Sequence, residues 1–173
     1  MKKILYLGAY LGTFAAFCIA ILAVTNGITA PRIAEIELQN FHNALLQSFP
    51  TATDFEIIET EIDYTPQIIK MFNNGEPLGI VYSQEVRGFV DVIRYLVGID
   101  MDGYFTSFIV LSSRETPGFG TRIANDEWLN RIVNQHASTE IDVLSSATVT
   151  TAPIIEALTV AYEDFTNRSM NLR

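Results

Sequence analysis

An apolar segment near the N-terminus, residues 4–24, constrains this chain more than any other feature. None of its 21 residues is charged, and a helix of about 20 apolar residues crosses the roughly 30 Å hydrocarbon core of a bilayer. A secretory signal peptide has a shorter apolar core and a small-residue cleavage site, and Ala23-Val24-Thr25 is a poor cleavage site. We therefore expect a permanent transmembrane anchor in residues 1–25.

The charges on either side of the anchor predict its orientation. Lys2 and Lys3 precede the apolar segment, and Arg32 is the only cation close behind it. The positive-inside rule places the N-terminus in the cytoplasm and the rest of the chain outside, in a single-pass protein of the cell (inner) membrane. Beyond the two lysines, 9 basic residues stand against 20 acidic ones. This acidic excess argues against binding nucleic acid or docking flat on anionic lipid.

Behind the anchor, the hydrophobic pattern predicts one compact α+β domain. Pro31 opens an amphipathic helix that ends near Pro50, so residues 26–50 form a connecting helix and residues 51–173 the domain. Asn74-Gly75 and Asp102-Gly103 predict tight turns between strands, because these residues accept positive φ. An antiparallel sheet with flanking helices follows from these patterns. The expected strands are 55–62, 67–72, 78–82, 89–99, 104–111 and a short 141–144, with helices at 127–133 and after residue 148.

A loop of mostly small residues lies just before the last helix. Residues 142–148 read Asp-Val-Leu-Ser-Ser-Ala-Thr, and Pro153 and an apolar-periodic run follow the terminal Thr148. A Thr at an N-cap with Pro in the first turn is typical of a helix start. Because a helix N-terminus has free N–H groups and a partial positive charge, it favours a phosphate there. The alternative is an ordinary Ser/Thr-rich turn that caps the helix.

A second glycine-containing loop precedes it in the chain. Residues 115–120 read Glu-Thr-Pro-Gly-Phe-Gly. Pro117 stiffens the turn, whereas Gly118 and Gly120 allow the backbone to approach a flat ligand closely. The alternative is a plain connection between a strand and a helix. A third block, Val97-Gly98-Ile99-Asp100 followed by Asp102-Gly103, lies ahead of this loop.

Together, in this order, the three blocks resemble the FMN-binding domain of the G subunit of the Rnf ion-translocating ferredoxin:NAD oxidoreductase complex. They are more distantly similar to the C subunit of the sodium-translocating NADH:quinone reductase. The resemblance covers about residues 88–158, and the anchor in a general way. Residues 142–148 are similar to a flavinylation motif: an acidic residue, two spacers, Ser or Thr, Gly, Ala, and a final Thr or Ser. Residues 115–120 are similar to the family's Glu-Thr-Pro-Gly-Leu-Gly loop.

This resemblance implies a covalent FMN, attached by a flavin transferase through its phosphate to Thr148. It also implies that Glu115 and Thr116 hydrogen-bond the flavin. One departure is Ser146, which stands where the family has Gly. If that backbone needs positive φ, serine is strained there. The remaining cofactor-binding candidates are Ser145, Ser146, Ala147, Thr150, Thr151, Gly118, Gly120, Gly88 and Phe89.

The residues themselves do not indicate an independent enzyme. Cys18, His42 and His136 are the only Cys and His residues, so we expect no metal site, and we expect both histidines on the solvated surface. The sequence contains no P-loop and no Gly-x-Ser-x-Gly nucleophile elbow. We therefore assign no catalytic side chain; in a redox carrier the cofactor supplies the chemistry.

The resemblance implies an electron-transfer subunit of an Rnf-type complex that couples ferredoxin:NAD electron transfer to Na+ or H+ translocation. Its partners would be the other membrane subunits, and Gly8 and Gly12 provide a small-residue pair suited to close helix packing. One alternative is a free-standing, membrane-anchored flavoprotein that donates electrons to extracytoplasmic acceptors. Another is a non-redox binding or pilin-like module, which would be colourless.

Overall fold

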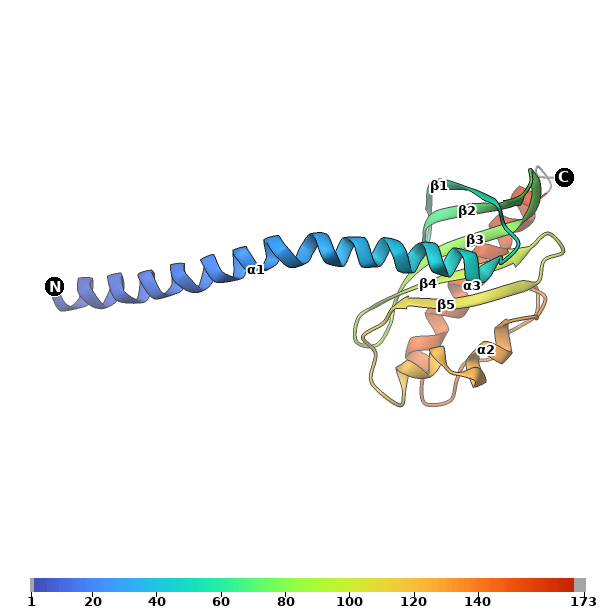
Figure 1. The fold of residues 1–173 in the computed structure, drawn as a ribbon. Helices are drawn as coiled ribbons and strands as arrows, with labels where there is room; N and C mark the ends of the chain where they lie inside the picture. The colour runs from blue at the N-terminus through green and yellow to red at the C-terminus, as the bar shows by residue number, and fades with distance from the viewer. Residues whose placement is uncertain (1, 170–173) are drawn as a thin grey trace. The chain divides into compact units, whose positions relative to one another are not determined.

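The computed structural model describes the backbone of residues 2–169 and, apart from residues 2, 5 and 59–61, their side chains. The side chain of Lys2 and the last four residues of the predicted domain therefore lie outside the described part. A long helix is followed by five strands and then by helices (Figure 1). The chain divides into two compact units, Met1–Asn40 and Phe41–Arg173. The predicted boundaries near residues 25 and 50 stay predictions.

The anchor and the connecting segment form one helix rather than two. Helix α1 (Lys2–Ser48) runs through Pro31 without ending. The prediction of a new helix at Pro31 was wrong, because a proline inside a helix removes one hydrogen bond and can kink the helix without terminating it. The stretch Tyr6–Ser48 is long and apolar enough to cross a membrane, by length and composition.

The five strands form one antiparallel sheet in sequence order. Both predicted turns are confirmed: Asn74 and Gly75 have φ of 51° and 87° between β2 and β3, and Gly103 has φ of 88° between β4 and β5. Each strand hydrogen-bonds the next, as short connections between antiparallel neighbours require. The strands are β1 (Asp54–Ile62), β2 (Thr65–Asn73), β3 (Glu76–Arg87), β4 (Val92–Asp100) and β5 (Phe105–Ser112).

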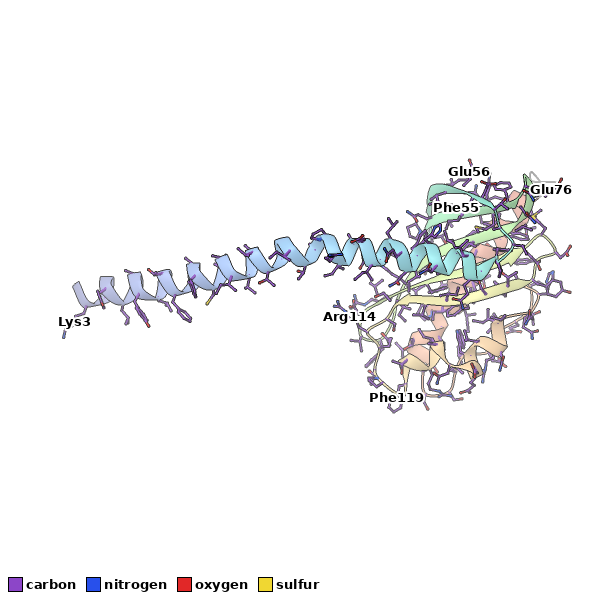
Figure 2. All side chains as sticks on the ribbon, viewed as in Figure 1. Lys3, Phe55, Glu56, Glu76, Arg114 and Phe119 are labelled. Atoms are coloured by element: carbon purple, nitrogen blue, oxygen red, sulfur yellow. The ribbon has the colours of Figure 1, made fainter. Side chains whose placement is uncertain are left out.

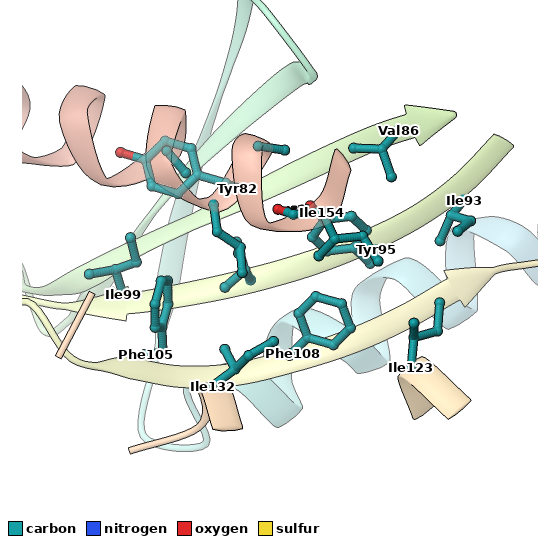
Figure 3. Close-up of a cluster of buried hydrophobic side chains, with 14 of the residues drawn as sticks. Tyr82, Val86, Ile93, Tyr95, Ile99, Phe105, Phe108, Ile123, Ile132 and Ile154 are labelled. Carbon is teal, nitrogen blue, oxygen red and sulfur yellow. Dashed lines mark hydrogen bonds between the residues drawn. The ribbon is translucent and has the colours of Figure 1, made fainter. Parts of the chain in front are cut away.

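Both faces of the sheet are covered, which explains why the central residues of β3 and β4, 79–82 and 95–99, are buried without a break. Side chains alternate between faces along a strand, so Tyr82 and Tyr95 lie on one face while Val81 and Leu96 lie on the other. The first face packs against α2 (Asp126–Ile132) and α3 (Thr148–Ser169) in the larger core (Figure 3). The second packs against the end of α1, through Leu45 and other residues.

The segment between α2 and α3 differs from the prediction. Residues 141–144 form no strand, because side chains satisfy their backbone groups. Arg131 donates to the carbonyls of Asp142 and Val143, both at 3.3 Å. The Leu144 N–H donates to the Thr151 hydroxyl at 3.2 Å.

Helix α3 begins at Thr148 itself, so Pro153 lies inside it rather than in its first turn. The helix starts early because the Ala147 carbonyl accepts hydrogen bonds from the N–H groups of Thr150 and Thr151. A 3₁₀ helix (Gly120–Ala124) precedes α2. His42 is exposed as expected, whereas His136 is half-buried and packs against the rings of Tyr104 and Tyr162.

Candidate functional site

A cavity of about 430 Å³ brings the two predicted motifs together at the N-terminus of α3. Its size lies within the range of small-molecule and cofactor sites, about 300–1,000 Å³. The loop after β5 and the loop before α3, far apart in sequence, face each other across it. The lining residues are Phe89, Glu115, Thr116, Phe119, Gly120, Ser146, Ala147, Thr148, Val149 and Thr150.

The first turn of α3 presents one hydroxyl outward and another inward. Thr148 is exposed and lines the cavity. Two residues on, Thr150 is buried, and its hydroxyl donates to the Glu115 carboxylate at 2.9 Å. The first N–H groups of a helix have no acceptor in the preceding turn. The Thr148 hydroxyl therefore lies where a helix N-terminus favours a phosphate.

The backbone at Ser146 has the conformation that the family's glycine suggests. Ser146 has φ of 69°, in the left-handed region that L-residues avoid. It is one of four described non-glycine residues with positive φ, the others being Tyr64, Asn74 and Asn134. Serine is therefore strained at this position, as expected if the backbone there requires positive φ.

Arg122 and Arg131 hold the loop before α3 in place through hydrogen bonds to its backbone carbonyls. Arg122 donates to the Ser145 carbonyl at 2.8 Å, and Arg131 to the carbonyls of residues 142 and 143. Both guanidinium groups also pair with Glu127 on α2. Arginine suits this role because its several N–H donors bind different acceptors at once. Neither arginine was predicted from the sequence, because no local motif marks them.

Glu115 is buried, and its oxygens bind protein groups. One oxygen accepts from the N–H groups of Val90 and Asp91, at 2.9 and 3.4 Å, and the other from Thr150. Burial alone raises the pKa of this carboxyl. The hydrogen bonds from Val90, Thr150, Asp91 and Phe89 outweigh that effect, so the pKa lies below its usual value. Glu115 is therefore an ionised part of the cavity wall.

The three loop glycines serve different purposes. A Cβ on Gly120 would lie 2.5 Å from a Glu115 carboxylate oxygen, and one on Gly88 would collide with the other oxygen. Both glycines thus make room for a side chain of this protein. Gly118 has φ of 79° and open space where its Cβ would be, so its backbone conformation explains the glycine.

Exposed apolar side chains surround the cavity. Phe89 is 68 %, Phe119 55 % and Val149 61 % exposed, although all three line it. Phe119 projects from the surface of the domain (Figure 2). Aromatic and aliphatic walls with a few polar groups are typical of sites for flat cofactors. Phe89 was predicted from the sequence, whereas Phe119 and Val149 were not, although Phe119 lies within the loop 115–120 and Val149 directly follows Thr148.

The other predicted site residues have distinct positions. Thr116 and Ala147 line the cavity, whereas Ser145, Thr151, Gly118 and Gly88 do not. Thr151 instead accepts from the Leu144 N–H and donates to the Ala147 carbonyl. The cavity fits the expected FMN in kind: it has apolar walls for a ring system and a helix N-terminus with a hydroxyl for a phosphate.

Comparison with known proteins gives two family matches. Residues 88–163 match the FMN-binding domain, and residues 1–47 match the RnfG N-terminal region. The first match contains the whole cavity lining.

Curated relatives extend over most of the chain. The chain is 28 % identical to the G subunit of the Na(+)-translocating ferredoxin:NAD(+) oxidoreductase complex of Acetobacterium woodii, covering 91 % of this chain and 83 % of that protein. It is 26 % identical to the G subunit of the ion-translocating oxidoreductase complex of Methanosarcina acetivorans, covering 83 % and 85 %.

A solved structure shares the fold. NqrC of Shewanella oneidensis matches with a TM-score of 0.51 and 16 % identity, over 72 % of this chain and 74 % of that one. These findings confirm the resemblance to the Rnf G subunit and the predicted α+β fold behind a long apolar helix.

Proposed function

The chain contains an FMN-binding domain behind an RnfG N-terminal region, and from this combination we propose that it is the electron-transferring G subunit of an Rnf-type complex. Such a complex couples ferredoxin:NAD electron transfer to ion movement, as the name of the Acetobacterium woodii relative states. The protein is one redox relay among the other membrane subunits and has no turnover of its own. The anchor holds it in the membrane.

We further propose that Thr148 is the attachment point for FMN. One observation carries this proposal: Thr148 is exposed at the mouth of the cavity where both motifs meet, on the first turn of α3. Exposure admits a flavin transferase, which a buried hydroxyl such as that of Thr150 does not.

The attachment is a phosphoryl transfer. The Thr148 hydroxyl oxygen forms a bond to the phosphorus of an activated FMN donor, whose phosphate is joined to a leaving group. The bond to that leaving group breaks, and the hydroxyl proton is released. The chain gains the mass of FMN less water.

The chain's residues then position the cofactor. A phosphate on Thr148 would lie at the N-terminus of α3, where the helix dipole favours it. Phe89, Phe119 and Val149 line the cavity and would shield apolar ring surface from water. Bound FMN supplies reversible uptake of electrons, which the protein tunes through its surroundings. Linkage through the phosphate leaves the ring system unmodified.

We propose that the FMN domain lies outside the cytoplasm. The support is the charge pattern: Lys2 and Lys3 precede the apolar segment, and the acidic excess follows it. On that side of the membrane the domain would be accessible to membrane partners and not directly to a soluble cytoplasmic electron donor.

The test is co-expression of the full chain with a flavin transferase, followed by denaturation, absorbance and intact mass. We expect a yellow protein with one FMN adduct in the wild type and none in Thr148→Val. Thr159→Val, an exposed threonine on the same helix, is the matched control and keeps the adduct. An adduct that persists in Thr148→Val assigns attachment to another hydroxyl and refutes the proposal.

Co-purification separates the alternatives. An Rnf subunit purifies with membrane partners, whereas a free-standing flavoprotein is yellow without them. A colourless wild-type protein after co-expression would support the non-redox module.

A further inference from the structure

The Glu115 carboxylate joins three segments that are separate in sequence. It extends from the loop after β5, accepts from the N–H groups of Val90 and Asp91 in the β3–β4 turn, and accepts from the Thr150 hydroxyl on α3. The side chain is only 4 % exposed. Hydrogen bonds to a buried charged group are among the stronger ones in proteins. The three segments are therefore fixed to one another at a single point.

The surrounding residues are fitted to that carboxylate. Gly88 and Gly120 flank it, and a Cβ on either glycine would overlap its oxygens. Gly120 also lines the cavity, whereas Gly88 does not. At both positions the space that a Cβ would occupy is filled by Glu115, so the glycines preserve the position of this side chain.

The hydrogen bond from Thr150 links the position of the Glu115 carboxylate to that of the attachment residue, Thr148. Thr148 and Thr150 share the first turn of α3, and an α-helical turn contains 3.6 residues. Fixing the Thr150 side chain therefore fixes the direction of Thr148. The negative charge also lies beside a helix N-terminus, where the helix dipole stabilises it.

We propose that Glu115 is a positioning residue that holds the first turn of α3 and the β3–β4 turn in place, so that the Thr148 hydroxyl faces the cavity before FMN is attached. Glu115 acts on Thr148 through Thr150. The inference deepens the proposed function, because it rests on Thr148 as the attachment point.

Thr150→Val tests the inference because it removes the hydroxyl that binds Glu115 but keeps the shape of the side chain. Thr150→Ser restores a hydroxyl, and Glu115→Gln removes the charge. Thr159→Val is the matched control. All variants are made in the full chain, purified in detergent without flavin, and compared by circular dichroism to establish that they fold.

The first measurement is amide hydrogen exchange of the flavin-free protein. We expect Thr150→Val and Glu115→Gln to increase exchange both in residues 148–151 and at Val90 and Asp91. Thr150→Ser and Thr159→Val should match the wild type. Loss of protection on α3 alone would mean that Thr150 stabilises only its own helix, and would overturn the inference.

The second measurement is the initial rate of FMN attachment by a flavin transferase, read as protein-bound fluorescence after denaturation. Thr150→Val removes a hydrogen bond to a buried charged group, so we expect it to slow attachment by about tenfold to a hundredfold. Thr150→Ser should recover most of the rate. A wild-type rate in Thr150→Val would overturn the positioning role.

The two measurements separate this inference from the proposed function. If the wild type gains no FMN, or if Thr148→Val gains it, the attachment site is wrong. Hydrogen exchange then still decides whether Glu115 links α3 to the β3–β4 turn: coupled loss of protection supports the link, and unchanged protection refutes it.

Discussion

Ser146→Gly should stabilise this protein, although glycine usually destabilises a folded chain. Ser146 has φ of 69° and an exposed side chain. A non-glycine residue in the left-handed region costs roughly 1–2 kcal/mol. Replacing it with glycine removes that strain and little packing.

The opposing effect is the greater freedom of glycine in the unfolded chain. That freedom costs about 0.5–1 kcal/mol on folding. The strain exceeds it, so we expect a net stabilisation of roughly 0.5–1 kcal/mol. For a domain of this size the melting temperature should rise by about 3 °C.

Ser145→Gly is the matched control, because it changes the same residue type one position earlier. Ser145 is also exposed and is not among the described non-glycine residues with positive φ. Glycine relieves no strain there and should destabilise by about 0.5–1 kcal/mol. The two neighbouring substitutions should therefore have opposite signs.

The assay is reversible urea unfolding of the full chain in detergent, followed by tryptophan fluorescence. Trp128 is the single tryptophan and is fully buried in the domain core. Stabilisation by Ser146→Gly together with destabilisation by Ser145→Gly supports the strain. Equal effects of the two substitutions would show that residue 146 carries no strain, and would refute the reasoning.

Substitutions and pH changes elsewhere in the chain have equally specific expected outcomes. Gly120→Ala should destabilise the domain by roughly 1–3 kcal/mol, because its Cβ would overlap the Glu115 side chain; a wild-type urea midpoint in this variant would contradict the overlap. Gly118→Ala, which has open space but positive φ, should cost about 1–2 kcal/mol through backbone strain alone. The pKa of the Glu115 carboxyl is lowered on folding. The ionised carboxylate therefore stabilises the folded domain above the unfolded pKa of about 4.3, and this stabilisation is lost as pH falls through the lower folded pKa. The melting temperature measured against pH should show this loss in the wild type but not in Glu115→Gln. Asn74→Cys should react with a membrane-impermeant thiol reagent on intact cells, whereas the wild type, with only Cys18 in its apolar segment, should not; reaction only after lysis would reverse the orientation.

Local patterns in the sequence were sufficient to locate the five strands and the two tight turns of the domain. Asn74-Gly75 and Asp102-Gly103 predicted both tight turns because positive φ is a property of those residues themselves. The five strand segments were found within a few residues for the same reason: alternation and β-branched composition are local. The apolar N-terminal segment could also be predicted without tertiary information, because the capacity of a helix to cross a membrane depends on its length and hydrophobicity.

The sequence was less informative about the conformation of two other segments. Residues 141–144 have strand-like composition, yet Arg131 and Thr151 take their backbone hydrogen bonds. Pro31 has the appearance of a helix start, yet the helix continues through it. The first outcome does not follow from local propensity, which tertiary contacts override. At Pro31 the described residues on either side are exposed, and the helix continues because a proline removes one hydrogen bond without necessarily ending the helix.

The site shows the same division between local and tertiary information. The sequence alone singled out the two loops that line the cavity, and predicted that residue 146 would be strained if its backbone required positive φ. Only the tertiary structure decided what each residue does there. It brought Glu115 against Thr150 and the β3–β4 turn, and so assigned Gly88 and Gly120 to accommodating a carboxylate. A hydrogen bond between residues 35 positions apart depends on how the sheet and α3 pack, and no spacing rule within either motif encodes that packing.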